Sequence, residues 1–328
     1  MSYLSGKTVL LTGGTGSFGK AMVKRLLADN EINKLIIFSR DELKQFEMQE
    51  VYDSPKLRYF IGDVRDYSRL KLAVEGVDAI IHAAAMKQIP ASEYNPMEAI
   101  KTNILGAENI VNIAIEKNVE KIIALSTDKA ANPANLYGAT KLCSDKLMVA
   151  GNILAGAKNT KFSVVRYGNV LGSRGSVIPF FKERAKTGII PITDEKMTRF
   201  WLTIEDGVQF VLDSFERMIG GEIFVPKIPS FKVTDVAKVV CPGVPTEIIG
   251  IRPGEKLHEV MITEDDAQNT LEFENYYAII SPTLGFGTSY PIEGKKVPTD
   301  FRFSSDNNEF WHTEESFLHL IKKHGLLD

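Results

Sequence analysis

A glycine-rich turn after the first apolar stretch limits the folds that this chain can adopt. The β-branched run at 7–12 leads directly into Gly13, Gly16 and Gly19, and a helical pattern follows. In a strand–turn–helix unit, such glycines allow a tight turn, let a pyrophosphate approach the backbone, and let the helix pack on the sheet. The helix N-terminus adds free N–H groups and the positive end of its dipole. This order of elements predicts a dinucleotide-binding turn.

Strand-like and helix-like segments alternate through the first half of the chain. Short apolar runs recur at 7–12, 34–39, 58–63, 78–84, 121–126 and 161–167. Strands that are buried on both faces have this composition. Helical spacing at 98–117 and 136–154 indicates crossover connections between them. The sequence therefore predicts an α/β fold with a Rossmann-type, doubly wound parallel sheet.

The alternation loosens after about Tyr167, where glycine and proline punctuate the chain. We expect a smaller C-terminal α/β lobe that binds the substrate. The expected division gives 1–168, with about 200–226 returning, to the cofactor domain, and gives about 169–199 and 227–328 to the lobe.

Composition argues against several classes of protein. The 328 residues include 39 Lys and Arg against 42 Asp and Glu, for a formal net charge of −3, which argues against binding to nucleic acid or to anionic membranes. Two cysteines and scattered histidines predict neither a disulfide framework nor a metal site. No apolar run approaches the ~20 residues that span a bilayer, and the N-terminus lacks a signal-peptide pattern. We expect a cytoplasmic protein.

The end of the second predicted strand bears on which dinucleotide binds. NAD-binding proteins usually place an acidic residue there for the ribose 2′-hydroxyl. Here the strand ends in Ser39 and Arg40, with Lys44 one helical turn later. A guanidinium can form two hydrogen bonds to a 2′-phosphate, so the pattern favours NADP. Asp41 leaves NAD open, because it would serve NAD if the chain turned one residue later, and Arg40 has the alternative of being a solvated surface charge.

A tyrosine and a lysine follow the fifth predicted strand at helical spacing. Tyr137 and Lys141 share one helix face, and an ammonium beside a phenol lowers the pKa of the phenol, so that it can act as a base. The strand itself ends in Thr127, Asp128 and Lys129. A reductase needs the tyrosine, the lysine and a hydroxyl, so the ionisable pair is an addition. Its alternative explanation is an ion pair that shapes the loop.

These residues resemble the motifs of the extended short-chain dehydrogenase/reductase family, whose members mostly act on nucleotide sugars. Longer stretches resemble the inverting UDP-N-acetylglucosamine 4,6-dehydratases of pseudaminic acid biosynthesis. They lie at 39–47, 82–87, 126–130, 166–170, 197–201 and 251–259. The resemblance implies a lyase that converts UDP-N-acetylglucosamine to UDP-2-acetamido-2,6-dideoxy-β-L-arabino-hex-4-ulose, with NADP recycled in each turnover. It also implies a homo-oligomer, either a dimer or a hexamer.

The chemistry of a dehydratase accounts for the ionisable pair. Once C4 of the sugar is oxidised, the C5 proton becomes acidic because the ketone delocalises the carbanion. One group must remove that proton, and another must protonate the departing 6-hydroxyl. We expect Asp128 to be the acid, Lys129 the base, and Tyr137 the base for the 4-hydroxyl. Retaining dehydratases of the family carry Glu in place of Lys129, so the resemblance links this lysine to inversion at C5.

The expected cofactor contacts come from the glycine turn, the strand ends and the catalytic helix. Asp63 can accept a hydrogen bond from the adenine amino group, and small side chains after the fourth strand let the backbone lie against the nicotinamide ribose. The full set is Gly13, Thr15, Gly16, Ser17, Phe18, Gly19, Ser39, Arg40, Lys44, Asp63, Val64, Ala83, Ala84, Ala85, Asn103, Tyr137, Lys141 and Val170.

A UDP-sugar carries two phosphates, so we expect cations and amides in the lobe, with arginine suited to bidentate phosphate binding. The resemblance implies contacts from Arg252 and Glu255 to the UDP ribose and phosphate. The expected substrate set is Lys87, Asn169, Arg174, Thr193, Met197, Arg199, Arg252 and Glu255.

Two other functions remain open from the sequence. The first is a retaining UDP-sugar 4,6-dehydratase or a 4-epimerase. The second is a non-catalytic NADP-sensing regulator, which would not need Tyr137 and Lys141 together. Two further residues are expected to be structural: His82 as a hydrogen-bonded buried residue and Cys143 as a packing residue.

Overall fold

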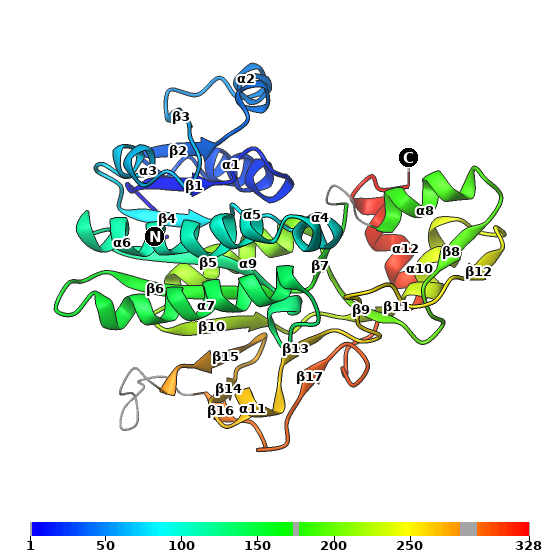
Figure 1. Ribbon diagram of the computed structural model, residues 1–328. Helices are drawn as coiled ribbons and strands as arrows, with labels where there is room; N and C mark the ends of the chain where they lie inside the picture. The colour runs from blue at the N-terminus through cyan, green and yellow to red at the C-terminus, as the bar shows by residue number, and fades with distance from the viewer. Residues whose placement is uncertain (1, 173–176, 283–293, 328) are drawn as a thin grey trace.

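A large sheet forms the centre of the molecule (Figure 1). The computed structural model describes residues 2–172, 177–282 and 294–327. The strands of the sheet are β1 (Thr8–Thr12), β2 (Lys34–Ser39), β3 (Leu57–Ile61), β4 (Ala79–His82), β5 (Lys121–Thr127), β6 (Lys161–Tyr167), β10 (Glu222–Pro226), β14 (Thr270–Glu272), β15 (Tyr276–Ile280) and β16 (Lys295–Lys296). Within this described part, their order is β16-β14-β15-β10-β6-β5-β4-β1-β2-β3.

The strands from β3 to β10 are parallel, and β15, β14 and β16 add an antiparallel edge. The order β3-β2-β1-β4-β5-β6 is that of a Rossmann fold. The predicted fold class is therefore confirmed.

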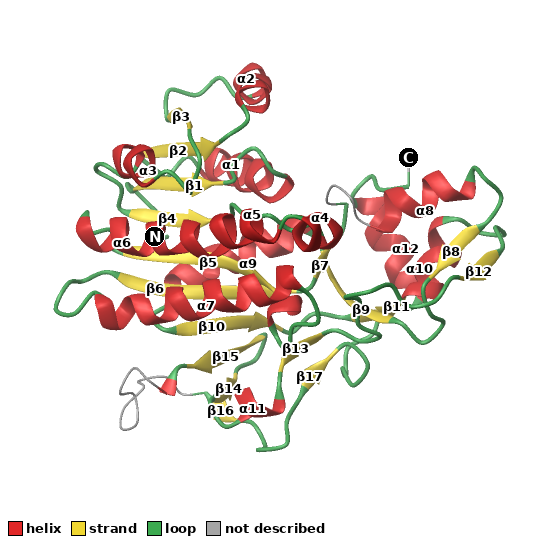
Figure 2. Ribbon diagram, in the orientation of Figure 1, coloured by secondary structure: helices red, strands yellow, loops and turns green. Residues whose placement is uncertain are grey.

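Helices cover both faces of the sheet. They are α1 (Ser17–Asp29), α2 (Glu42–Val51), α3 (Tyr67–Ala73), α4 (Ile89–Tyr94), α5 (Pro96–Ile100), α6 (Gly106–Glu116), α7 (Leu136–Leu154) and α9 (Ile204–Arg217). In Figure 2, α6 and α7 lie in front of the sheet and α9 lies behind it, where it packs against α1. Because both faces are covered, all five residues of β1 and of β10 are buried.

A smaller lobe lies to the right in Figure 1 and has a hydrophobic core of its own. Its elements are β7 (Asn169–Val170), α8 (Val177–Ala185), β8 (Ile190–Ile192), β9 (Thr198–Leu202), β11 (Ser230–Lys232), α10 (Val233–Val240), β12 (Thr246–Ile248) and α12 (Glu314–Lys323). Trp201 is fully buried there and meets the ring of Phe317 edge-on, with the ring centroids 5.8 Å apart. The aromatic contact ties the C-terminal helix to β9.

Part of the expected lobe packs with the large sheet instead. Residues 260–282 and 294–304 contain β14 to β16 together with β13 (Val260–Ile262), α11 (Glu264–Ala267) and β17 (Phe303–Ser304). Their apolar side chains, such as Met261, Ala278 and Phe303, belong to the core of the large sheet. The predicted assignment of all of 227–328 to the lobe therefore differs from the structure here, because β15 pairs with β10 and completes the sheet edge.

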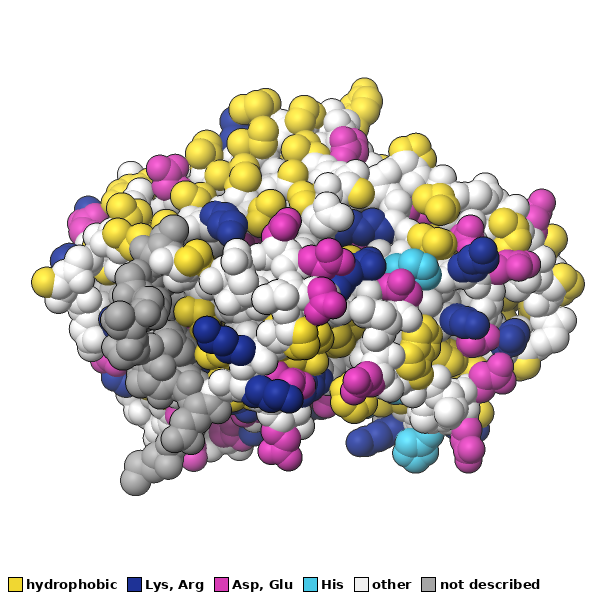
Figure 3. Space-filling view, turned by 90° about the horizontal axis from the view of Figure 1, so that it is seen from below, with side chains coloured by type: hydrophobic (Ala, Val, Ile, Leu, Met, Phe, Trp, Pro, Cys, Tyr) yellow, Lys and Arg dark blue, Asp and Glu magenta, His cyan; other side chains and the backbone are white. Residues whose placement is uncertain are grey.

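The surface carries charges of both signs. On the face shown in Figure 3, basic and acidic side chains alternate with apolar ones. This pattern fits the nearly balanced charge of the sequence.

The last glycine of the turn sets the distance between α1 and β1. A Cβ on Gly19 would overlap the backbone carbonyl of Gly14, so only glycine lets the helix start this close to the strand. In contrast, a Cβ on Gly207 in α9 would make an ordinary contact, 3.4 Å from Cδ1 of Leu202.

We predict that Gly19→Ala lowers the free energy of unfolding by about 1–3 kcal/mol, because the new methyl must push backbone apart. Gly207→Ala is the matched control and is expected to leave stability unchanged or raise it slightly, since alanine favours a helix interior. Urea unfolding followed by circular dichroism measures both. A Gly19→Ala midpoint equal to that of Gly207→Ala would contradict this account of the turn.

Candidate active site

A cleft of about 1210 Å³ runs along the carboxyl ends of the parallel strands and into the small lobe. Ligand sites of open α/β sheets lie at this edge. The predicted site residues that line it are Gly13, Thr15, Gly16, Ser17, Phe18, Gly19, Ser39, Arg40, Lys44, Asp63, Val64, Ala83, Ala84, Ala85, Lys87, Thr127, Lys129, Tyr137, Lys141, Asn169, Val170, Thr193, Met197, Arg199, Arg252 and Glu255. Asp128 and Asn103 lie behind its wall, and Arg174 lies outside the described residues.

The glycine turn forms one end of the cleft. Gly13 has a φ of +68°, and a Cβ there would lie 2.9 Å from the backbone nitrogen of Ala84. The turn is closed by a hydrogen bond of 2.9 Å from the Gly16 N–H to the Gly13 carbonyl. The N-terminus of α1 follows at once, and no side chain caps it. This cradle fits the pyrophosphate of a dinucleotide.

Charged side chains surround the end of β2. Arg40 is exposed, and its Nη1 lies 3.6 Å from Oδ2 of Asp63. Burial acts to raise the pKa of Asp63, but hydrogen bonds from Arg65 hold it below its ordinary value. Asp41 caps α2 by accepting from the Lys44 N–H at 3.0 Å, and it also pairs with the Lys44 ammonium. The acidic candidate for a ribose hydroxyl is therefore occupied within its own helix.

Asn103, which we expect to contact the cofactor, holds part of the protein backbone in the structure. Its side chain is buried and holds the loop after β4: it accepts from the Met86 N–H at 2.8 Å and donates to the Met86 carbonyl at 2.9 Å. It also donates to Oγ1 of Thr140 on α7 at 3.0 Å. These bonds occupy its amide, so Asn103 shapes the cleft from behind. Sequence spacing does not distinguish a residue that holds a loop by hydrogen bonds from one that contacts a ligand.

Two other expectations concern structural residues. His82 is buried, and its Nδ1 lies 2.8 Å from Oγ1 of Thr12, as expected for a hydrogen-bonded core histidine. Burial, aided by the nearby Lys141, lowers its pKa to about 3. Thr12 Oγ1 also accepts from the Ala83 N–H at 3.1 Å. Cys143, in contrast, is exposed on α7, so its prediction as a packing residue is wrong.

The predicted catalytic residues meet where β5 ends and α7 begins. A 3₁₀ turn over Asp128–Ala130 follows β5. A Cβ on Gly138 would overlap the Lys129 carbonyl, so this glycine lets the first turn of α7 pack against that turn. The Thr127 hydroxyl donates to Oδ1 of Asp128 at 2.8 Å and bonds the Tyr137 phenol. Threonine therefore links the phenol to the carboxylate.

The electrostatics of Tyr137 differ from the expectation. Burial raises its pKa to about 12, while the Lys129 cation and the Thr127 hydrogen bond act to lower it. Lys141 was the predicted source of that lowering, but the structure gives this effect to Lys129. Burial lowers the pKa of Lys141, opposed by Asp145. The cation that lowers the pKa of the Tyr137 phenol therefore comes from the turn after β5.

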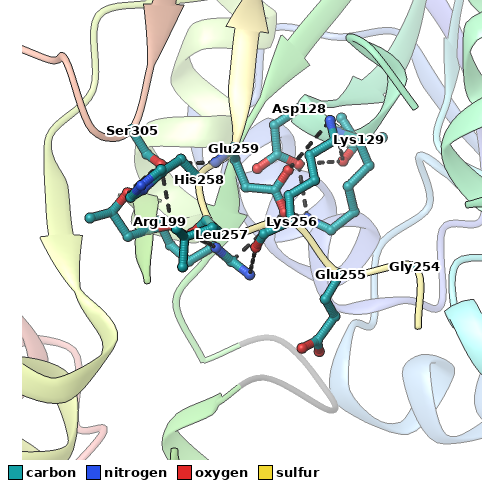
Figure 4. Close-up of polar contacts among 12 residues, drawn as sticks. Asp128, Lys129, Arg199, Gly254, Glu255, Lys256, Leu257, His258, Glu259 and Ser305 are labelled. Atoms are coloured by element: carbon teal, nitrogen blue, oxygen red, sulfur yellow. Dashed lines mark hydrogen bonds and ion pairs between the residues drawn. The ribbon is translucent and has the colours of Figure 1, made fainter. Parts of the chain in front are cut away.

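Lys129 lies between two carboxylates (Figure 4). Its Nζ is 3.0 Å from Oδ1 of Asp128 and 3.4 Å from Oε1 of Glu259. Burial acts to lower the pKa of Lys129, but the two carboxylates outweigh it and raise the pKa. Burial, with a contribution from Glu259, raises the pKa of Asp128. Glu259 lines the cleft but was assigned no role from sequence, although it ends the stretch 251–259.

The substrate end contains arginines in two different states. Arg199 is buried, and its guanidinium donates to backbone carbonyls of Thr198, Lys256 and Leu257 at 2.7–3.0 Å. Its donors therefore hold the loop as well as face the cleft. Arg252 is exposed, and its Nε lies 3.5 Å from Oε1 of Glu255.

The described residues contain no cluster of three or more His, Cys, Asp or Glu side chains that could hold a metal. Over the same ranges, no helix combines the length and the apolar character needed to cross a membrane.

The sheet order, the glycine turn and the Tyr–Lys helix define an extended short-chain dehydrogenase/reductase fold. The chain belongs to the family described as polysaccharide biosynthesis protein, whose model matches residues 9–281. It is 59% identical over 325 residues to a Campylobacter jejuni UDP-N-acetylglucosamine 4,6-dehydratase (inverting), covering 96% of this chain and 97% of that protein. The predicted resemblance is thereby confirmed.

Other relatives carry other names. A Rickettsia conorii protein named UDP-glucose 4-epimerase is 42% identical, with 94% of each chain covered. The X-ray structure of Pen from Bacillus thuringiensis superposes with a TM-score of 0.91 at 36% identity, covering 99% of this chain and 100% of that one. The structure of the dTDP-glucose 4,6-dehydratase DesIV from Streptomyces venezuelae with NAD bound shares the fold at a TM-score of 0.68, with 22% identity over 76% of this chain and 86% of that chain.

Proposed function

We propose that this protein catalyses the NADP-dependent, inverting 4,6-dehydration of UDP-N-acetylglucosamine, the first step of pseudaminic acid biosynthesis. The observation that carries the proposal is the partly buried Lys129 amine, held at the cleft beside Tyr137 and in contact with Asp128. The name and the 59% identity of the Campylobacter jejuni relative support the reaction and the substrate. An epimerase that rotates a 4-keto intermediate has no need for an amine and a carboxylate at this place.

The cleft fits a nicotinamide dinucleotide on its own geometry. The bare backbone of Gly13 and Gly16 would hold the pyrophosphate, and Lys141 would reach the nicotinamide ribose. Arg40 and Lys44 would face a ribose 2′-phosphate, which favours NADP, because Asp41 is occupied as a helix cap. When bound, the cofactor accepts a hydride from C4 of the sugar and returns it to C6.

The side chains can move the protons of this reaction. Tyr137 takes the proton of the 4-hydroxyl as a phenolate, the form that the Lys129 cation stabilises. Because the pKa of Lys129 is raised, the amine must first release a proton, and Asp128, whose own pKa is raised, is the adjacent acceptor. The amine then removes the C5 proton and passes it to the departing 6-hydroxyl. Asp128 recharges Lys129, which reprotonates C5 on the opposite face.

The proton count of this cycle closes. Tyr137 has gained one proton and the Asp128–Lys129 pair has lost one, and Thr127 bonds both Tyr137 and Asp128. Return of the proton through the threonine hydroxyl restores the starting state. Asp128 therefore acts through the Lys129 amine, which agrees with its position behind the cleft wall.

The regulator and the retaining or epimerising enzyme are the alternatives. Incubation with UDP-N-acetylglucosamine in heavy water, followed by NMR, tests them. We expect a 6-deoxy-4-keto product with deuterium at an inverted C5 and no accumulation of NADPH. Retained configuration, or a 6-hydroxyl still in place, favours the first alternative, and inactivity with NADP still bound favours the regulator.

We predict that Lys129→Ala lowers the rate of dehydration by at least about 100-fold, because it removes the group that carries protons to and from C5. NADP binding is expected to stay nearly intact. Lys238→Ala, which removes an exposed lysine of the lobe, is the control for loss of a positive charge. Loss of NADP binding in Lys129→Ala would instead assign this residue an architectural role.

We predict that Arg40→Ala weakens NADP binding about 10-fold or more while changing NAD binding little, because a charged hydrogen-bond partner of the 2′-phosphate is lost. Fluorescence titration with both dinucleotides measures the ratio. Arg58→Ala, at an exposed arginine of β3 that does not line the cleft, is the matched control. Equal weakening of both dinucleotides would contradict the phosphate contact.

The proposal extends to the setting in which the enzyme works. We infer a homo-oligomer, a dimer or a hexamer, located in the cytoplasm. Its ligands are a UDP-sugar and NADP, with no nucleic acid or membrane partner. The resemblance to the dehydratase family supports these points.

A further inference from the structure

The loop before β13 carries an acidic residue that the reaction above does not yet use. Glu259 is buried, and it nevertheless lines the cleft. Its backbone is fixed on both sides by Ser305 of the segment after β17: the Glu259 N–H donates to Oγ of Ser305 at 2.9 Å, and the Ser305 N–H donates to the Glu259 carbonyl at 2.8 Å. The carboxylate is therefore presented from a rigid frame (Figure 4).

Cations surround this carboxylate. Oε1 lies 3.4 Å from Nζ of Lys129 and 3.7 Å from Nε of Arg199, and Oε2 lies 3.9 Å from Nζ of Lys256. Lys256 in turn donates to the Ala131 carbonyl at 2.7 Å, so the loop is also tied to the β5 turn. Burial acts to raise the pKa of Glu259, but these three cations hold it below its ordinary value. Glu259 thus stays ionised.

The other carboxylate beside Lys129 has a different environment. Asp128 is fully buried, with Lys129 as its cationic partner and the Thr127 hydroxyl as a donor. The charge of Glu259 adds to burial in raising the pKa of Asp128. The two carboxylates beside the Lys129 ammonium thus differ: the surrounding cations lower the pKa of Glu259, whereas burial and Glu259 raise the pKa of Asp128.

We propose that Glu259 is a positioning residue that holds the Lys129 amine at the cleft and, by remaining ionised, directs the mobile proton onto Asp128. This role rests on the dehydration proposed above. Glu259 contacts Lys129 from the loop before β13, so the amine is held by two elements that are far apart in the chain. Glu259 acts on the proton carrier Lys129 and not on the nucleotide sugar, so the proposal adds no new ligand to the site.

The proposal predicts a displaced pH profile. The groups that face Lys129 are Asp128 and Tyr137 from the β5–α7 region, Arg199 from β9, and Lys256 and Glu259 from the loop. The Asp128–Lys129 pair titrates as a unit and works with one shared proton. Removing the negative charge of Glu259 lowers the proton affinity of the pair, so both limbs of its bell-shaped profile move to lower pH.

The test compares Glu259→Gln with wild-type protein, using kcat and KM for UDP-N-acetylglucosamine across pH. We expect kcat near neutral pH to fall about 10- to 100-fold, since a hydrogen-bonded charged partner of the amine is lost. KM and NADP content should change little, and both limbs of the kcat profile should move to lower pH. An unmoved profile, or a loss confined to KM, would overturn the proposal.

Two further variants make the result specific. Glu272→Gln removes the carboxylate of another Glu–Lys pair, 2.8 Å from Nζ of Lys227 and outside the cleft, and should behave as wild type. Glu259→Asp keeps the charge at a shorter reach, so its profile should stay near that of wild type while kcat falls. If Glu259→Gln does not fold, Glu259→Asp decides: full wild-type kcat would overturn the positioning role.

The wild-type measurement separates this proposal from the one on which it rests. Wild-type protein that does not dehydrate UDP-N-acetylglucosamine would overturn both. Dehydration by wild type, with an unchanged profile in Glu259→Gln, would overturn the role of Glu259 alone.

Discussion

One partly buried ammonium beside two buried carboxylates is the interaction on which the site depends. Moving charges out of water is costly, and a buried charge is tolerated only when its partners are close and well placed. Lys129 meets this condition through Asp128 on its own turn and Glu259 from a distant loop. Arg199 and Lys256 then balance Glu259. The cluster therefore joins the end of β5, β9 and the loop before β13. The same ion pairs that surround Lys129 also hold these three regions together.

The two parts of the molecule make separate contributions to the cleft. At the carboxyl edge of the parallel sheet lie the glycine turn, the alanines after β4 and the 3₁₀ turn after β5. They lie at one edge because the carboxyl ends of parallel strands point the same way. The lobe and the loop at 251–259 close the cleft from the other side. Arg199 holds that loop by donating to the backbone carbonyls of Lys256 and Leu257.

Related chains carry the names of a dehydratase and of an epimerase. Both activities pass through a sugar oxidised at C4, so a dinucleotide turn and a Tyr–Lys helix are common to them. What differs in chemical demand is the handling of protons at C5 and at the departing hydroxyl. In the proposed cycle, a proton carrier flanked by an ionised carboxylate and a proton-accepting one meets that demand, and the link through Thr127 returns the proton from Tyr137.

The sequence by itself determined the α/β fold, the glycine turn and the residues that meet at the end of β5, because these depend on local periodicity and on spacing within short segments. It did not show that Asn103 holds the loop after β4, that Cys143 is exposed, that Lys129 acts on the pKa of Tyr137, or that residues 260–282 and 294–304 pack with the large sheet. Only the tertiary structure decided these points, because Asn103 brackets a loop 17 residues away and Glu259 meets Lys129 across 130 positions of chain. Burial and the charges that folding brings together set the pKa of each group, and neither can be predicted from the spacing of residues in the sequence.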